Sequence, residues 1–148
     1  LELVLSQDIT SFWELSGNLN LYRINIKGHT GNLLFPYPHT FEIKSSSDVT
    51  WDSKIINTFT ISDDLEIQLT GLYFADKDIP QGIQFSRSSI DLGIKKNLWD
   101  GKGELTLAAT DMMNRFGLRQ EIEGDGFVAE YQNFYETQTI RIAFKYKF

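Results

Sequence analysis

The feature that most constrains this chain is a long alternation of apolar and polar residues. In residues 139–148 the apolar members are Ile140, Ile142, Phe144, Tyr146 and Phe148, separated by single Arg, Ala and Lys residues. Successive side chains of a β-strand point to opposite faces, so such a segment forms a strand with one apolar and one polar face. The same alternation occurs in residues 1–7, 12–27, 40–61, 65–74, 89–98 and 104–110. We therefore expect an all-β chain of about seven strands.

The connections between these segments are of two kinds, which alternate strictly along the chain. Short breaks lie at residues 8–11, 62–64 and 100–103, and long ones at residues 28–39, 75–85 and 113–127. Asp100-Gly101 is a strong signal for a tight hairpin turn. The pattern predicts an antiparallel up-and-down meander with short turns at one end and long loops at the other, as in an outer-membrane β-barrel. Several segments also reach the length of about 9 to 11 residues that a tilted membrane strand needs.

The composition excludes several classes of protein. Lys and Arg number 14 against 20 Asp and Glu among 148 residues, and this net charge of -6 argues against nucleic acid as a partner. The absence of cysteine excludes a disulfide scaffold, a thiol redox centre and cysteine-ligated zinc. No apolar run approaches the length of about 20 residues that a transmembrane helix requires.

The sequence contains no recognisable motif for catalysis or for binding a metal or cofactor. It has neither a Gly-x-Ser-x-Gly elbow nor an HExxH motif, and its glycine-rich turns lack phosphate-loop spacing. His29 and His39 have no further metal ligands at suitable spacing. The acidic residues of the second and third long loops do not follow the ligand order of an EF-hand; they are Asp76, Asp78, Glu121, Glu123 and Asp125. We interpret them as a solvated rim and expect no enzymatic activity, no metal and no cofactor.

The first long loop and the residues after it carry a group of aromatic side chains. Phe35, Tyr37 and His39 lie within a few residues of one another, with prolines on both sides of Tyr37 and Phe41 two residues beyond His39. Because binding residues concentrate on loops, these three are candidate contacts for a ligand at the loop end. The alternative is that the aromatic residues only pack against one another.

The most specific part of the sequence lies in residues 86–148. Residues 89–107, the segment Asp111-Met112-Met113-Asn114-Arg115-Phe116 and the alternating residues 140–148 resemble the last hairpins of TonB-dependent outer-membrane receptors. They are most similar to the outer-membrane β-barrel family abundant in Bacteroidetes. Residues 12–20 are similar to an earlier strand of the same barrels, so the resemblance extends over nearly the whole chain.

This resemblance implies a location in the bacterial outer membrane and several partners. These are the lipid of the outer membrane, a plug domain of the same receptor, TonB indirectly, and the barrel-insertion machinery. In the family the final strand ends in an aromatic residue that the insertion machinery recognises. The resemblance assigns that assembly signal to Phe148, with Phe144 and Tyr146 before it.

The resemblance also implies that residues 1–148 are the C-terminal segment of a larger barrel, without the plug domain and the earlier strands. The implied function is to supply barrel wall, extracellular loops and assembly signal to a receptor that imports a nutrient. In isolation such a fragment is expected to self-associate through its free edges. The alternative is a soluble β-barrel or β-sandwich module that binds a small apolar ligand or a partner protein, with the apolar faces enclosing an ordinary core.

Overall fold

The computed structural model describes residues 1–124, 126–133 and 135–148. Its regular structure there consists of β-strands, and none of these residues belongs to a helix long and apolar enough to cross a membrane. Seven strands form the largest sheet, which we call the wall sheet: β1 (Glu2–Thr10), β2 (Trp13–Ile26), β5 (Ser46–Ser62), β6 (Leu65–Phe74), β9 (Arg87–Leu98), β10 (Gly103–Thr110) and β13 (Thr139–Tyr146).

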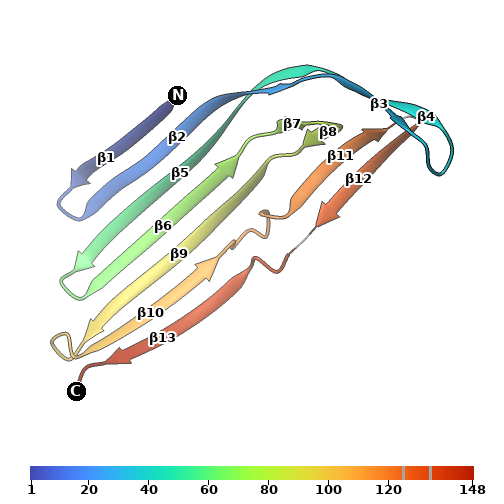
Figure 1. Cartoon of the computed structure of the whole chain (residues 1–148). Coiled ribbons are helices and arrows are strands. Elements are labelled where there is room, and N and C mark those ends of the chain that lie inside the picture. The colour runs from blue at the N-terminus through green and yellow to red at the C-terminus, as the bar shows by residue number, and fades with distance from the viewer. Residues whose placement is uncertain (125, 134) are drawn as a thin grey trace.

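The wall sheet is an up-and-down antiparallel meander (Figure 1). Its strands are ordered β1-β2-β5-β6-β9-β10-β13, and every neighbouring pair is antiparallel. Each strand therefore follows its predecessor in the sheet without a crossover. The expected all-β architecture of about seven antiparallel strands is confirmed.

The three short turns lie at one end of the wall sheet, which we call the turn end. The β9–β10 turn shows why its sequence suits the position: the Lys102 amide donates to the Trp99 carbonyl at 3.1 Å, closing a two-residue turn. Its central residues, Asp100 and Gly101, have φ of 53° and 84°. A positive φ at both central residues is typical of a type I′ turn. Asp-Gly favours this turn because glycine adopts a positive φ without steric cost.

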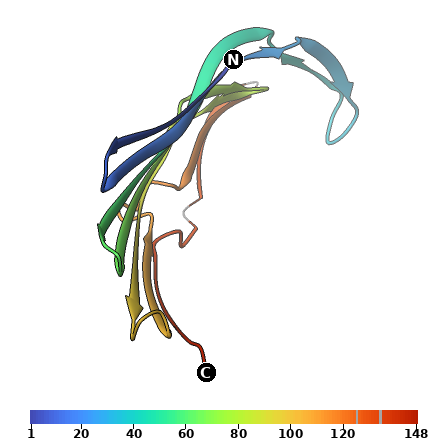
Figure 2. The ribbon, with the colours of Figure 1, turned by 90° about the vertical axis from the view of Figure 1, so that its left-hand side faces the viewer.

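The long connections at the opposite, loop end are themselves built from strands. β3 (His29–Leu33) pairs with β4 (His39–Ile43), β7 (Lys77–Ile79) pairs with β8 (Gly82–Gln84), and β11 (Leu118–Gly124) pairs with β12 (Phe127–Asn133). β8 also pairs with β11, which joins the last two hairpins into a four-stranded sheet in the order β12-β11-β8-β7. In Figure 2 the β3–β4 hairpin arches away from the wall sheet to one side.

Apart from the first strand, which continues to Thr10 through most of the break expected at residues 8–11, two boundaries differ from the sequence-based expectation. The segment expected as one strand over residues 40–61 is two strands, because the chain leaves regular pairing at Lys44 and Ser45 and the first part pairs with β3 instead of β2. The last long connection extends over residues 111–138, not 113–127. In both places polar residues alternate too weakly with apolar ones to mark where pairing changes.

The wall sheet has no hydrophobic core in the part of the chain that the structure describes. No hydrophobic side chain there is buried, and the buried polar residues are Thr50, Ser89 and Asp111. Large apolar side chains of the last strand are instead mostly open, with Ile140 77% and Ile142 71% exposed. A soluble sheet buries its apolar face, so this face requires a surrounding that is not water.

Candidate membrane-facing wall and loop-end site

The apolar residues of the wall sheet form continuous rows across its strands. The register aligns one row through six strands: Trp13, Phe59, Ile67, Ile94, Leu107 and Ile142. Directly opposed residues of antiparallel strands lie on the same face, so these side chains share one side, which we call the apolar face. Leu105, Ile140, Phe144 and Tyr146 fall on the same side by register, which confirms the expected division of faces.

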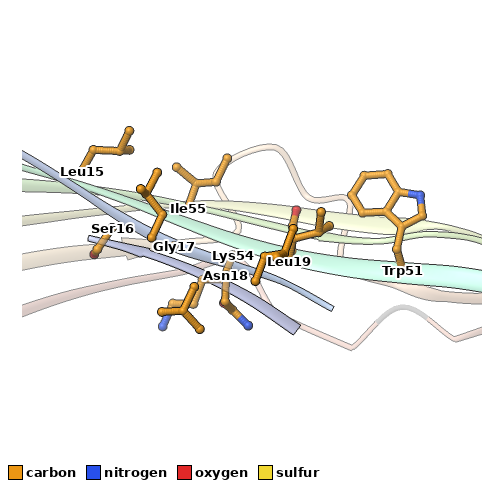
Figure 3. A pocket seen from close by; sticks show the side chains of 12 residues that line it. Leu15, Ser16, Gly17, Asn18, Leu19, Trp51, Lys54 and Ile55 are labelled. Atoms are coloured by element: carbon orange, nitrogen blue, oxygen red, sulfur yellow. The ribbon is translucent and has the colours of Figure 1, made fainter. Parts of the chain in front are cut away.

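The opposite side, the polar face, carries charged and hydroxyl side chains. One row contains Thr60, Glu66, Lys95, Thr106 and Ala143. On this face Lys95 Nζ lies 3.6 Å from Glu104 Oε2, and Asn20 Nδ2 donates to Asp52 Oδ1 at 3.2 Å. Figure 3 shows the division directly, with Leu15, Ile55 and Trp51 projecting from one side of the strands and Asn18 and Lys54 from the other.

Aromatic side chains border the apolar face at two heights. Trp51 and Tyr73 have ring centroids 4.8 Å apart toward the loop end, and Trp13 and Phe59 are stacked at 5.9 Å toward the turn end. On β5, Trp51 and Phe59 are eight residues apart, which is about 27 Å along an extended strand. A strand tilt of about 40° shortens this to about 21 Å, close to the apolar band of about 25 Å in membrane β-barrels. The arrangement suits a wall whose apolar face contacts lipid between two aromatic belts.

The apolar face has a shallow hollow over β1, β2 and β5. The hollow has a volume of about 470 Å³, and Leu3, Leu5, Leu15, Leu19, Trp51 and Ile55 are among the residues around it. Gly17 lies in its floor, opposite Leu5 on one side and Ile55 on the other. A Cβ at Gly17 would lie 2.5 Å from the Lys54 carbonyl oxygen, so the close approach of β2 to β5 requires glycine there.

The expected assembly residues lie together at the turn end. The Trp99 ring is 6.0 Å from the rings of both Phe144 and Tyr146, and the Tyr146 ring is 5.2 Å from that of Phe148. The Lys147 amide donates to the Lys102 carbonyl at 2.8 Å, which holds the last residues beside the β9–β10 turn. The cluster is exposed, and its role as an assembly signal stays a prediction.

At the loop end, three hairpins border an open cavity of about 610 Å³ with both polar and apolar lining residues. Its walls come from β3–β4 and the start of β5, from the tip of β7–β8 and from the tip of β11–β12. The lining residues include the charged Glu42, Lys44, Asp78 and Glu123, the uncharged polar Thr30, Thr40, Ser46 and Gln81, and the apolar Phe41, Ile79, Pro80 and Ile83. This mixture suits a solute with both polar and apolar parts.

The aromatic residues expected to contact a ligand do not line this cavity. Phe35 is 86% and Tyr37 65% exposed at the tip of the β3–β4 hairpin, and His39 Nδ1 lies 2.9 Å from the Tyr37 carbonyl oxygen. Their role in ligand contact therefore stays a prediction. Phe41, which belongs to the same aromatic group, does reach the cavity. Of the cavity residues on β7–β8 and β11–β12, Asp78 and Glu123 were noted in the sequence for their acidity, and the others carry no sequence signal.

Asp111 anchors the last long connection where it leaves β10. Its side chain is 2% exposed and accepts hydrogen bonds from the Arg115 amide at 3.0 Å, the Phe116 amide at 3.2 Å and the Thr137 hydroxyl at 2.6 Å. Burial raises the pKa of the Asp111 carboxyl, but the hydrogen bonds from Thr137, Arg115 and Phe116 together outweigh it and leave the pKa below its usual value. The carboxylate thus ties both ends of the connection together.

The other acidic residues of the loop end form no cation site in the described ranges. No group of three or more His, Asp or Glu side chains there has the geometry to hold a metal ion. Asp76 instead accepts a hydrogen bond from the Ser86 amide, and Glu130 pairs with Arg119 at 3.2 Å. Asp125 lies outside the described residues.

Comparison with protein-family models gives a match over nearly the whole chain. The model of the outer membrane protein beta-barrel family matches residues 1–146. Comparison with curated proteins and with solved structures gives no match.

Proposed function

Because the chain belongs to the outer membrane protein beta-barrel family, we propose that it forms part of the wall and the extracellular mouth of a TonB-dependent receptor that imports a nutrient. The family places the chain in the bacterial outer membrane. There the apolar face contacts lipid and the polar face lines the barrel interior, as in other membrane β-barrels. Short turns then face the periplasm and the strand-built hairpins face outward.

The exposed apolar face argues against the alternative of a soluble module. In the described part of the chain the apolar rows have no opposing layer, and Ile55 and Ile142 remain 50% and 71% exposed. At about 25 cal/mol for each square ångström of apolar surface, leaving such rows in water is strongly unfavourable. Lipid removes this cost without a second layer of protein.

The two edges of the wall sheet support a place within a larger barrel. Among the described residues, no strand pairs with the outer edge of β1 or of β13. Unpaired strand edges are unfavourable in a membrane because no water is present to bind their amide and carbonyl groups. Further strands that cover both edges would satisfy these groups, as in a receptor barrel much wider than seven strands.

The loop-end cavity is the observation that carries the import proposal. It has a volume of about 610 Å³, charged residues are among those that line it, and three separate hairpins contribute to it. A barrel that served only as a membrane anchor would not need such a mouth, whereas a receptor captures its solute there before transport. Release into the periplasm would then depend on a plug domain in the barrel and on energy delivered through TonB.

Uptake by living cells tests this proposal. Cells with and without the protein that carries this chain are given labelled cobalamin, a ferric siderophore, an oligosaccharide and an oligopeptide, each with and without a protonophore. We expect one of them to enter only when the protein is present and the membrane is energised. Glu42→Gln together with Glu123→Gln in the cavity lining should reduce that uptake, with Glu66→Gln on the polar face of β6 as the matched control. The proposal is contradicted if both strains take up all four compounds equally. It is also contradicted if the protonophore does not reduce the uptake that depends on the protein.

A further inference from the structure

Arg87 is held in a fixed position on the polar face near the loop end. Its register partner on β6 is Phe74, and the Arg87 guanidinium carbon lies 4.9 Å from the Phe74 ring centroid and 4.7 Å from that of Phe116. The two rings themselves are 5.9 Å apart at an angle of 66°. Phe116 is in turn held by its amide hydrogen bond to Asp111. The planar cation is thus clamped by aromatic rings from two elements of the fold.

The guanidinium of Arg87 has no hydrogen-bond or ion-pair partner among the described residues. Its Nε is buried without a partner. Nη1 and Nη2 are not among the buried unpartnered atoms, and they donate to no carboxylate of this part of the chain. The two rings stack on the guanidinium, and its Nη atoms have no acceptor among the described residues. A guanidinium is always charged, so its Nη edge is a permanent pair of donors that lacks an acceptor in this part of the chain.

Arg119 provides an internal comparison. Its guanidinium carbon lies 4.2 Å from the Phe85 ring centroid, so it also stacks on an aromatic side chain. Unlike Arg87, it has a carboxylate partner, because its Nε lies 3.2 Å from Glu130 Oε1. Arg87 stacks on two rings instead of one and has no carboxylate partner among the described residues.

We propose that Arg87 is a preorganised binding site for a carboxylate, which docks on its Nη edge inside the barrel mouth. A carboxylate matches the two parallel N–H groups of a guanidinium and forms charge-assisted hydrogen bonds with them. Clamping by the two rings lowers the entropy lost on binding. This inference rests on the proposed function, because it takes the polar face to line the interior. The carboxylate comes either from an imported solute or from an Asp or Glu of the polypeptide that occupies the barrel.

Nuclear magnetic resonance of arginine side chains tests the site in the whole purified protein that carries this chain, held in lipid nanodiscs. Arginine is labelled with ¹⁵N and ¹³C, and the Arg87 signals are identified by their loss in Arg87→Lys. Sodium acetate is the probe, titrated against sodium chloride at constant ionic strength. Arg119 is the reference for a guanidinium with a carboxylate, and the exposed Arg23 is the reference for a solvated one.

Two results support the site and identify the source of the acid. If the Arg87 guanidinium rotates slowly without acetate, as that of Arg119 does, its Nη atoms give separate signals. This result indicates a carboxylate from the polypeptide. Averaged signals that shift saturably with acetate, about tenfold more tightly than at Arg23, indicate a site open to solutes. Averaged signals that stay unchanged, or that follow Arg23 in a linear, unsaturated response, show an adventitious ion only and overturn the inference. Since the purified protein is used, this outcome is independent of the uptake experiment.

Discussion

Replacement of Asp111 should release the last loop-end hairpin, β11–β12, from the wall sheet. The residue has two properties that a substitution can separate. Its carboxylate accepts three hydrogen bonds, and its backbone has a φ of 45°, a region that favours asparagine and aspartate over alanine. Asp111→Ala removes the acceptor and strains the backbone, whereas Asp111→Asn keeps the backbone preference and one acceptor oxygen.

The size of the effect follows from the three hydrogen bonds. A hydrogen bond to a charged group contributes about 1.5–3 kcal/mol, and the contributions within one cluster are not additive. We expect Asp111→Ala to lower the free energy of local opening by about 3 kcal/mol or more, which is about a hundredfold in the opening equilibrium. We expect Asp111→Asn to lower the free energy of local opening by about 1.4 kcal/mol, which is roughly tenfold in the opening equilibrium.

Hydrogen exchange of the Arg115 and Phe116 amides measures this opening, because both amides donate to Asp111. The protein is studied in nanodiscs, and the amide of Leu107 within β10 reports on the wall itself. The exchange rates of the Arg115 and Phe116 amides should rise more in Asp111→Ala than in Asp111→Asn. The exchange rate of the Leu107 amide should stay unchanged in both. Asp78→Asn, at a carboxylate that accepts no hydrogen bond in the described contacts, is the matched control. Equal exchange in Asp111→Ala and the unsubstituted protein would refute the anchor.

Three further outcomes are expected. Ile55→Arg, at the middle of the apolar face, should destabilise the folded protein in bilayers by about 2–4 kcal/mol, whereas Ile56→Arg on the polar face should cost much less; equal losses in urea titrations would contradict the assignment of faces. Phe148→Asp should sharply reduce the amount of protein in outer-membrane fractions while Phe148→Tyr retains it, and normal levels of the Asp variant would remove the assembly role. Because the pKa of Asp111 is lowered in the folded state, its stabilisation is complete above the usual aspartate pKa and is lost as pH falls through the lowered value; exchange at the Arg115 amide should show this acid step, and Asp111→Asn should abolish it.

The wall sheet was predictable because its signals are local. In each strand apolar and polar residues alternate with a period of two. The short turns contain polar residues or glycine, as Asp100-Gly101 shows between β9 and β10. In an up-and-down meander the order of strands follows the order of the sequence, so no long-range pairing has to be guessed. Among the loop-end strands, β4 was predicted as part of one strand with β5, whereas β7 and β8 were missed because each is three residues long. A period of two cannot be recognised over three residues.

For the side-chain clusters around Asp111 and Arg87, the sequence predicted only that they lie near the long connections. Asp111 lies in a segment of distinctive sequence, but its partner Thr137 is 26 residues away and has no pattern of its own. The clamp around Arg87 joins side chains from β6, β9 and the connection after β10. Such sites depend on register between distant segments, and alternation within one segment does not determine that register.

The directions of the two edge strands limit how the barrel can be completed. Every neighbouring pair in the wall sheet is antiparallel, and β1 and β13 are its first and seventh strands, so both run from the loop end to the turn end. A second copy of this sheet in the same membrane orientation would place its β1 parallel to β13. Antiparallel pairing at both edges instead requires an intervening set of strands that begins and ends with one running from the turn end to the loop end. Such a set contains an odd number of strands, and together with the seven described here it gives the even total found in bacterial outer-membrane barrels.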